Sequence, residues 1–281
     1  MKWILKAVPV FILMTSADAT VLLNDTFSDG DRTNTGLPSS GKWILTGIGA
    51  TVANPPLTSV VTDGALVSQS ANTATSFSLV STFNSHTLAV GVSMILSFSV
   101  TLSFAGSASA SSLRVGLFNS GGTVPTADSN GGNGADPAFN AWVGYSYWSP
   151  YGSITGVDSN IRERSGTDNI LFGTTVNPSR NTSAYTSGSI VNGTTYQGSF
   201  RLTNDGSSLT VAATLGTNTQ SWTDTSPSAT SFDALGFFAG ATPIGANGSF
   251  TLDNVMVETI PAPSSAVLAA IAPVLLLRRR R

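Results

Sequence analysis

The 281-residue sequence contains no cysteine and only one histidine, His86. The lack of cysteine excludes disulfides, thiolate metal sites and cysteine nucleophiles together. Charged residues make up only 10% of the chain, and between residues 20 and 260 fourteen acidic residues outnumber seven basic ones, a net charge of about −7. Phosphate backbones would repel a segment with this net negative charge, so the sequence predicts no nucleic-acid partner.

Catalytic patterns are also scarce. His86 has neither a Gly-x-Ser-x-Gly motif nor metal-ligand spacing around it, which argues against a serine triad or a zinc site. A glycosidase needs two carboxylates about 5 to 10 Å apart, but the body has only two glutamates, Glu163 and Glu258. Arg162 and Arg164 flank Glu163 and would lower its pKa, the wrong direction for a general acid. The sequence therefore predicts that the protein is not an enzyme; a secreted polysaccharide-degrading enzyme is the alternative.

The start of the chain, residues 1–19, has the order of a secretory signal peptide. Two lysines precede a short apolar stretch, residues 7–14, and Ala17 and Ala19 form a small-x-small cleavage site. The pattern predicts a signal helix that is removed by cleavage after Ala19. The alternative is a first strand or helix that is buried in the body.

The chain ends in an apolar run closed by four arginines: Arg278, Arg279, Arg280 and Arg281. The run itself, residues 266–277, would form a helix of about 18 Å against a hydrocarbon core of about 30 Å. The stretch from Ile260 onward nearly spans the core if the arginine stems reach the headgroups. Because positive charge beside a membrane segment resists translocation, we expect the arginines on the cytoplasmic side and the body outside.

Pro261 and Pro263 precede this hydrophobic helix, and the three-part layout of residues 260–281 resembles the PEP-CTERM sorting signal of Gram-negative bacteria. In that family an exosortase, a membrane-embedded cysteine transpeptidase, recognises Pro-Glu-Pro and processes the tail; here Ala262 replaces the glutamate. The resemblance implies transient anchoring in the inner membrane and sorting to the outer surface or the extracellular matrix. An uncleaved tail anchor is the alternative.

The body, residues 20–259, has short β-rich runs separated by Gly, Asn, Asp and Ser turns. Asp205-Gly206 between two such runs predicts a hairpin, and the change of alternation within residues 249–258 predicts a β-bulge. No stretch has sustained helical periodicity. The sequence therefore predicts one all-β domain, an antiparallel β-sandwich of the jelly-roll type. The runs DTFSDGDR and SFTLDNVMVE resemble concanavalin/laminin-G-like sandwiches, a resemblance that implies a fold that often holds carbohydrate.

Residues 138–152 hold the densest group of aromatic side chains. On a strand, Trp142 and Trp148 would lie on one face and Tyr145 and Tyr147 on the other. Because a sandwich strand buries one face, one aromatic set is expected at the surface, where with Tyr151 it would stack on sugar rings. The alternative is that a loop covers the second set.

A calcium site is the other candidate functional site, because the sequence offers oxygen ligands that suit a hard cation. Asp128, Asn130 and Asp136 lie in a Gly-rich loop that offers several oxygen ligands to calcium, or is a solvated loop of turn-forming residues. The resemblance to lectin-like sandwiches also implies a calcium ion that joins the first and last strands through Asp253 and one of Asp25, Asp29 and Asp31. No cofactor is required by the sequence, and a structural calcium ion is the one expected. The expected function is that of an exported, non-enzymatic protein associated with extracellular polysaccharide or the cell envelope and able to bind carbohydrate; a purely structural matrix component is an alternative.

Overall fold

The computed structural model describes residues 19–47, 58–69, 76–103, 111–129, 134–151, 159–183, 190–240 and 248–261. Within these ranges the chain forms strands and short 3₁₀ turns, and no helix is long and apolar enough to cross a membrane. Ala19 is exposed ahead of the first strand, and Pro261 follows the last one. The two expected terminal helices lie outside the described residues, as do Ala17, Pro263 and the four terminal arginines.

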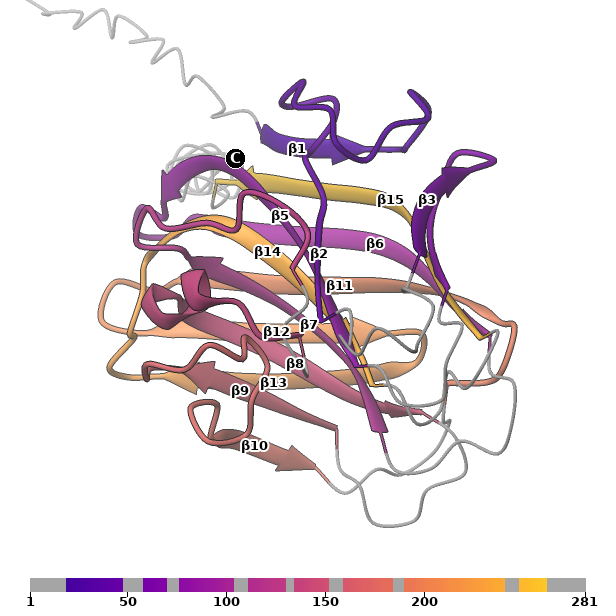
Figure 1. Ribbon diagram of the computed structural model, residues 1–281. Coiled ribbons are helices and arrows are strands. Elements are labelled where there is room, and N and C mark those ends of the chain that lie inside the picture. Colours follow the sequence, from indigo (N-terminus) through magenta and orange to yellow (C-terminus); the bar gives the residue numbers. More distant parts are fainter. Residues whose placement is uncertain are drawn as a thin grey trace, which may run out of the picture.

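The strands form two sheets that pack face to face as a sandwich (Figure 1). In the eight-stranded sheet the order is β13 (Asn218–Asp224), β12 (Leu209–Leu215), β11 (Thr195–Asn204), β6 (Ser93–Ser103), β15 (Ser249–Ile260), β4 (Ala65–Gln69) and β3 (Thr58–Thr62), and β1 (Thr20–Asp25) also pairs with β15. In the seven-stranded sheet the order is β10 (Ser179–Ser183), β9 (Ser159–Arg164), β8 (Val143–Tyr151), β7 (Ser111–Asn119), β14 (Ser231–Ala239), β5 (Phe77–Thr87) and β2 (Ile44–Thr46).

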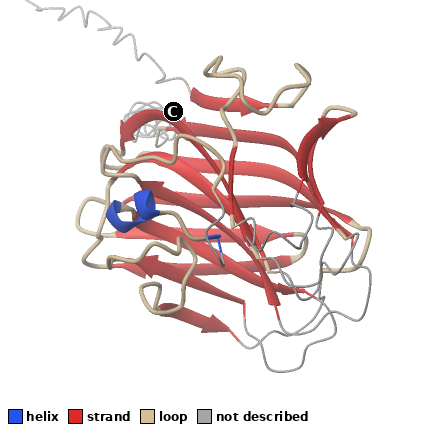
Figure 2. Cartoon of the chain, in the orientation of Figure 1, coloured by secondary structure: helices blue, strands red, loops and turns tan. Residues whose placement is uncertain are grey.

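Every pairing between these strands is antiparallel, and strands dominate the described residues (Figure 2). The antiparallel all-β sandwich that the sequence predicts is therefore confirmed. One short 3₁₀ helix, η2 (Pro137–Ala141), precedes β8, and the Asp136 carboxylate caps it by accepting from the Ala138 amide.

Strand alternation explains the main core. Along β12, Leu209, Val211 and Ala213 are buried between the sheets while the intervening residues point outward. The β11–β12 hairpin turns at Asp205-Gly206, where Gly206 has φ +97° and the Asp205 amide donates to the Ser208 carbonyl. The predicted hairpin is confirmed.

The predicted bulge in the last strand is also present. The register between β15 and β6 shifts between Asp253 and Met256, and Asn254 has φ +50°. Phe250 and Leu252 before the shift and Val255 and Val257 after it are therefore all buried.

A second apolar cluster lies on the outer face of the seven-stranded sheet. Its members come from the sheet, from η2 and from the segment after β9: Ile44, Val80, Phe118, Phe139, Trp142, Trp148, Leu171, Phe172, Ala234 and Phe238. This sheet is therefore buried on both faces, which alternation within single strands does not predict.

Candidate functional site

The aromatic strand does not form an exposed platform. Trp142, Tyr145, Tyr147 and Trp148 are all buried, with at most 5% of any side chain exposed. The two sets do lie on opposite sides of the sheet, as the alternation predicts. The tyrosines belong to the inner core, while Trp148 on β8 and Trp142, which caps η2 just before β8, belong to the outer cluster. The expectation that one set is exposed is wrong. Only the backbone of Tyr151 is described, at the end of β8.

Two arginine side chains stack on the ring of Trp148, where the sequence predicts a bound sugar. The guanidinium carbons of Arg114 on β7 and Arg162 on β9 lie 3.7 and 3.8 Å from the ring centroid of Trp148. The Trp148 indole also donates to the Ser146 hydroxyl. Stacking of this kind stabilises both partners and closes the ring to solvent. The outer face of β8 is thus a packed layer.

On the inner face Tyr145 donates a 2.8 Å hydrogen bond from its hydroxyl to Asp224 on β13. Burial and this neighbouring carboxylate raise the pKa of Tyr145 well above its ordinary value. Tyr145 therefore stays protonated and joins the two sheets rather than acting as a base.

The expected calcium ligands are engaged by groups of the protein. The buried Asp25 carboxylate accepts from the Phe27 and Gly41 amides and from the Trp43 indole. Asp253 accepts from its neighbour Asn254.

In the Gly-rich loop Asp136 caps η2, Asp128 is paired with Arg32, and Asn130 lies outside the described residues. Within the described ranges no three acidic or histidine side chains are grouped closely enough to hold a metal ion. The structure therefore does not bring the expected ligands together.

The candidate acid and base groups are also far apart. Glu163 is buried on β9 and forms a 2.7 Å ion pair with Arg180, whereas His86 lies on β5. These strands are four positions apart in the sheet, about 19 Å at the usual strand spacing. The two groups cannot act on one bond.

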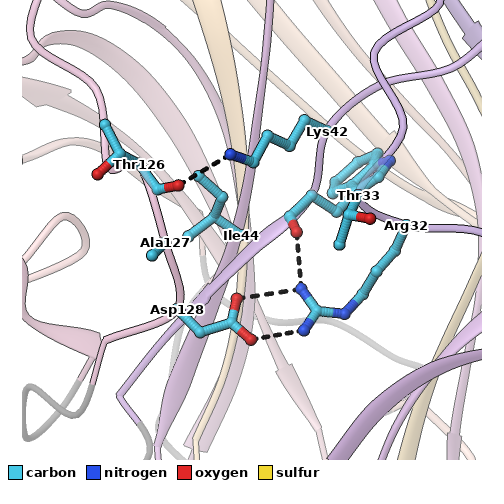
Figure 3. A pocket seen from close by; sticks show the side chains of 8 residues that line it. Arg32, Thr33, Lys42, Ile44, Thr126, Ala127 and Asp128 are labelled. Carbon is cyan, nitrogen blue, oxygen red and sulfur yellow. Dashed lines mark hydrogen bonds and ion pairs between the residues drawn. The ribbon is translucent and has the colours of Figure 1, made fainter.

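A pocket of about 470 Å³ lies between the segment after β1, the start of β2 and the loop after β7 (Figure 3). We call it the Arg32–Asp128 pocket; its lining residues are Arg32, Thr33, Lys42, Trp43, Ile44, Thr126, Ala127 and Asp128. Pockets of this size hold small ligands such as a sugar unit.

A two-point ion pair fixes one wall of the pocket. The two terminal nitrogens of Arg32 lie 3.0 and 2.5 Å from the two oxygens of Asp128. Arg32 also donates to the Trp43 and Ser59 carbonyls, and the Leu45 amide donates to Asp128. Planar, fully bonded pairs of this kind are rigid.

The ionisation of Asp128 follows from these contacts. Partial burial would raise the pKa of Asp128, but hydrogen bonds from Arg32 and Leu45 outweigh it, and the pKa lies below its ordinary value. Asp128 therefore remains ionised at neutral pH and is available as an acceptor at the pocket edge.

Lys42 supplies the cationic donor of the pocket. Its ammonium lies 2.8 Å from the Thr126 carbonyl (Figure 3). An ammonium carries three N–H donors, so this contact leaves two for a ligand. With Arg32 and Asp128 mutually neutralised, the pocket has a net charge of about +1 and can bind a hydroxyl-rich or carboxylate-bearing group.

A smaller hollow of about 310 Å³ lies on the outer face of the seven-stranded sheet. Arg114, Asp168, Thr174 and Phe238 contribute to its lining. Arg114 is held there by the Phe172 carbonyl and its stacked rings. The hollow therefore belongs to the layer that covers β8.

No protein-family model matches the chain, and no curated protein matches its sequence. Among solved structures the chain is similar to the lectin UEA-II complexed with galactose, at 13% identity over 88% of this chain and 100% of that chain, with a TM-score of 0.50. It is also similar to the metal-free carbohydrate recognition domain of Emp46p, at 11% identity over 86% and 96% of the two chains, with a TM-score of 0.51.

The fold is lectin-like. The potassium-bound form of the Emp46p domain is equally similar, with a TM-score of 0.51 at 10% identity. At these identities the likeness establishes the lectin-like arrangement of the two sheets and transfers no binding residue. The Arg32–Asp128 pocket therefore rests on the geometry of this chain alone.

Proposed function

We propose that this protein binds carbohydrate without transforming it, and that the Arg32–Asp128 pocket holds a sugar unit. The pocket carries the proposal, because it combines a fixed carboxylate acceptor with the Lys42 ammonium on a lectin-like sandwich. Charged donors and acceptors held in place bind hydroxyl groups at a small loss of side-chain entropy. No structural metal ion is needed for this site.

The proposal includes export. Residues 1–19 direct the chain across the inner membrane, and the tail anchors it there until an exosortase processes it. The body then associates with extracellular polysaccharide or the envelope on the outer surface of the cell. The two terminal sequence patterns support this part of the proposal.

Mass spectrometry of the protein recovered from its producing cells tests the export. We expect a mature form that begins at Thr20 and lacks the terminal arginines, found outside the cytoplasm. Recovery of the untrimmed chain from the cytosol would contradict export, and a trimmed start with an intact arginine tail would identify an uncleaved anchor instead.

The pocket is tested with Lys42→Gln, which removes the ammonium and keeps a polar side chain. We expect about five- to tenfold weaker binding to fragments of the cells' own exopolysaccharide, measured by calorimetry or on a glycan array, because a hydrogen bond from a charged donor is lost. Thr167→Gln places the same glutamine on the exposed loop after β9, outside the residues that line the pocket, and should bind as the wild type does. Equal affinity of Lys42→Gln and wild type would overturn the assignment of this pocket.

A purely structural matrix component is the second candidate. The burial of Trp142, Tyr145, Tyr147 and Trp148 favours it, because these rings serve packing and offer no sugar platform. This candidate predicts that no glycan is bound more tightly by the wild type than by the Lys42→Gln variant.

A further inference from the structure

The outer face of the eight-stranded sheet presents short hydroxyl side chains in rows. Along β12 and β13 buried or half-buried inner residues alternate with outward-facing ones that are mostly threonine or serine. Two rows cross neighbouring strands, and we call them the hydroxyl rows: Thr219, Thr214, Ser199 and Ser97 form the first, and Thr223, Thr210, Thr203 and Ser93 form the second.

An unbroken register creates these rows. The pairings of β13 with β12, of β12 with β11, and of β11 with β6 run without a shift. Residues in one row are therefore direct cross-strand partners, about 4.8 Å apart along the row. The two rows are separated by one intervening row of outward residues.

Hydrogen bonds order the hydroxyl groups in advance. Ser93, itself buried, lies 2.8 Å from the Thr203 hydroxyl, and Thr214 lies 3.3 Å from Thr219. A hydroxyl offers one donor and two acceptor positions, so the Thr203 and Thr214 hydroxyls keep capacity for a ligand beside these contacts, whereas Ser93 holds Thr203 in place from below the surface. Threonine is also stiff at χ1, which keeps the entropy lost on binding small.

Charge is almost absent from this surface. Among the described outward-facing residues of β6, β11, β12 and β13, Arg201 is the only charged one, and the exposed Asp205 carboxylate of the β11–β12 turn accepts from Thr210 at the end of the second row. Protein surfaces designed for solubility carry about 25–35% charged residues. The body also has a net charge of about −7 between residues 20 and 260, which would repel an acidic polymer. These two facts favour an uncharged partner.

The chemistry of the rows matches an extended sugar chain. A pyranose unit presents hydroxyl groups at its edge and C–H groups on its faces, and threonine presents a hydroxyl beside a methyl. The step from strand to strand is close to the length of one sugar unit in an extended β-linked chain. A chain laid along the first row would therefore meet one side-chain hydroxyl for each sugar it passes, and a chain along the second row would do so on β13, β12 and β11, because Ser93 on β6 is buried.

We propose that the hydroxyl rows bind an uncharged, extended β-linked polysaccharide whose chain runs across the strands. This surface is separate from the Arg32–Asp128 pocket and goes beyond the function proposed for it. Each contact is weak in water, and affinity comes from several of them acting together on one polymer.

The test is retention of the full protein by microcrystalline cellulose and by a soluble mixed-linkage β-glucan. We expect the wild type to be retained, and retention to change less than about twofold between low and high salt, because no charge pair is involved. Thr203→Lys with Thr214→Lys places one long cation in each row and should lower the partition constant at least about tenfold. Thr203→Val with Thr214→Val keeps the shape, removes the hydroxyls and should lower it by a smaller factor.

A matched control adds the same two charges elsewhere. The control variant carries Thr123→Lys and Thr167→Lys, at two residues on exposed loops near the other sheet. The glucans should retain it as they retain the wild type. Absence of wild-type binding to both glucans, or equal retention of the row variants, would overturn the proposal. A concentration-dependent dimer that the lysine variants abolish would assign the face to self-association instead. The pocket is tested with Lys42→Gln on exopolysaccharide fragments and the rows are tested with the row variants on the glucans, so the two proposals can fail separately.

Discussion

Replacement of Arg164 by methionine is expected to lower the free energy of unfolding by about 3–5 kcal/mol. Arg164 is fully buried near the end of β9. Its guanidinium donates to a ring of backbone carbonyls that methionine cannot satisfy: those of Phe139, Trp142, Asp168, Ile170 and Leu171. These carbonyls belong to the two segments that cover the outer apolar cluster, so their loss of partners loosens the layer over Trp142 and Trp148.

Arg164 is still a cation in this setting. Burial lowers the pKa of Arg164 to about 10, and the nearby Asp168 opposes that shift. At pH 7 the side chain is therefore protonated and keeps all its donors. Lysine keeps the charge but presents three donors from one point, so Arg164→Lys should recover only part of the lost stability.

Chemical denaturation of the wild type and the variants measures the effect. Arg201→Met removes an exposed arginine and should change the free energy of unfolding by less than about 0.5 kcal/mol. A loss of less than about 1 kcal/mol for Arg164→Met would show that water satisfies the carbonyls, and the role assigned to Arg164 would be wrong.

Replacement of Asp25 by alanine is expected to lower the free energy of unfolding by about 3–4 kcal/mol. The Asp25 carboxylate is 1% exposed and accepts three hydrogen bonds of 2.8 to 2.9 Å, from the amides of Phe27 and Gly41 and from the Trp43 indole. Alanine leaves all three buried donors unsatisfied. Because Trp43 and Phe27 pack against each other, the segment that carries Arg32 and Lys42 should also lose its position.

Asp253→Ala is the matched control, since Asp253 is partly exposed and its hydrogen bonds within the described ranges come from its neighbour Asn254. It should lose less than about 1 kcal/mol. The Asp25→Ala loss should be the same in calcium and in EDTA, because protein donors already hold the carboxylate. A loss that appears only in calcium would restore Asp25 as a metal ligand.

The sequence predicts those structural features that are set by residues close together along the chain. The period-two pattern of Leu209, Val211 and Ala213, the turn at Gly206 and the bulge before Val255 are local properties, and the structure contains each of them. The opposite faces of Trp148 and Tyr147 follow from the same alternation.

Whether a face of a strand is exposed or covered depends on contacts between residues that are far apart in sequence, and the sequence does not predict these contacts. The outer cluster forms because Arg164 fixes irregular segments over β8, and irregular segments have no period to detect. The pair of Arg32 and Asp128 joins residues 96 positions apart, and charge spacing gives no signal for it. The Asp128 side chain was therefore expected in a calcium loop and lies instead in an ion pair.

The two sheets differ in how they tolerate change. Apolar groups cover the seven-stranded sheet on both sides, so nearly every substitution there disturbs packing and endangers folding. The outer face of β6, β11, β12 and β13 carries mostly serine and threonine side chains, and residues there can be exchanged with little effect on stability. New recognition properties can therefore accumulate on one side of the molecule while the other side preserves its architecture.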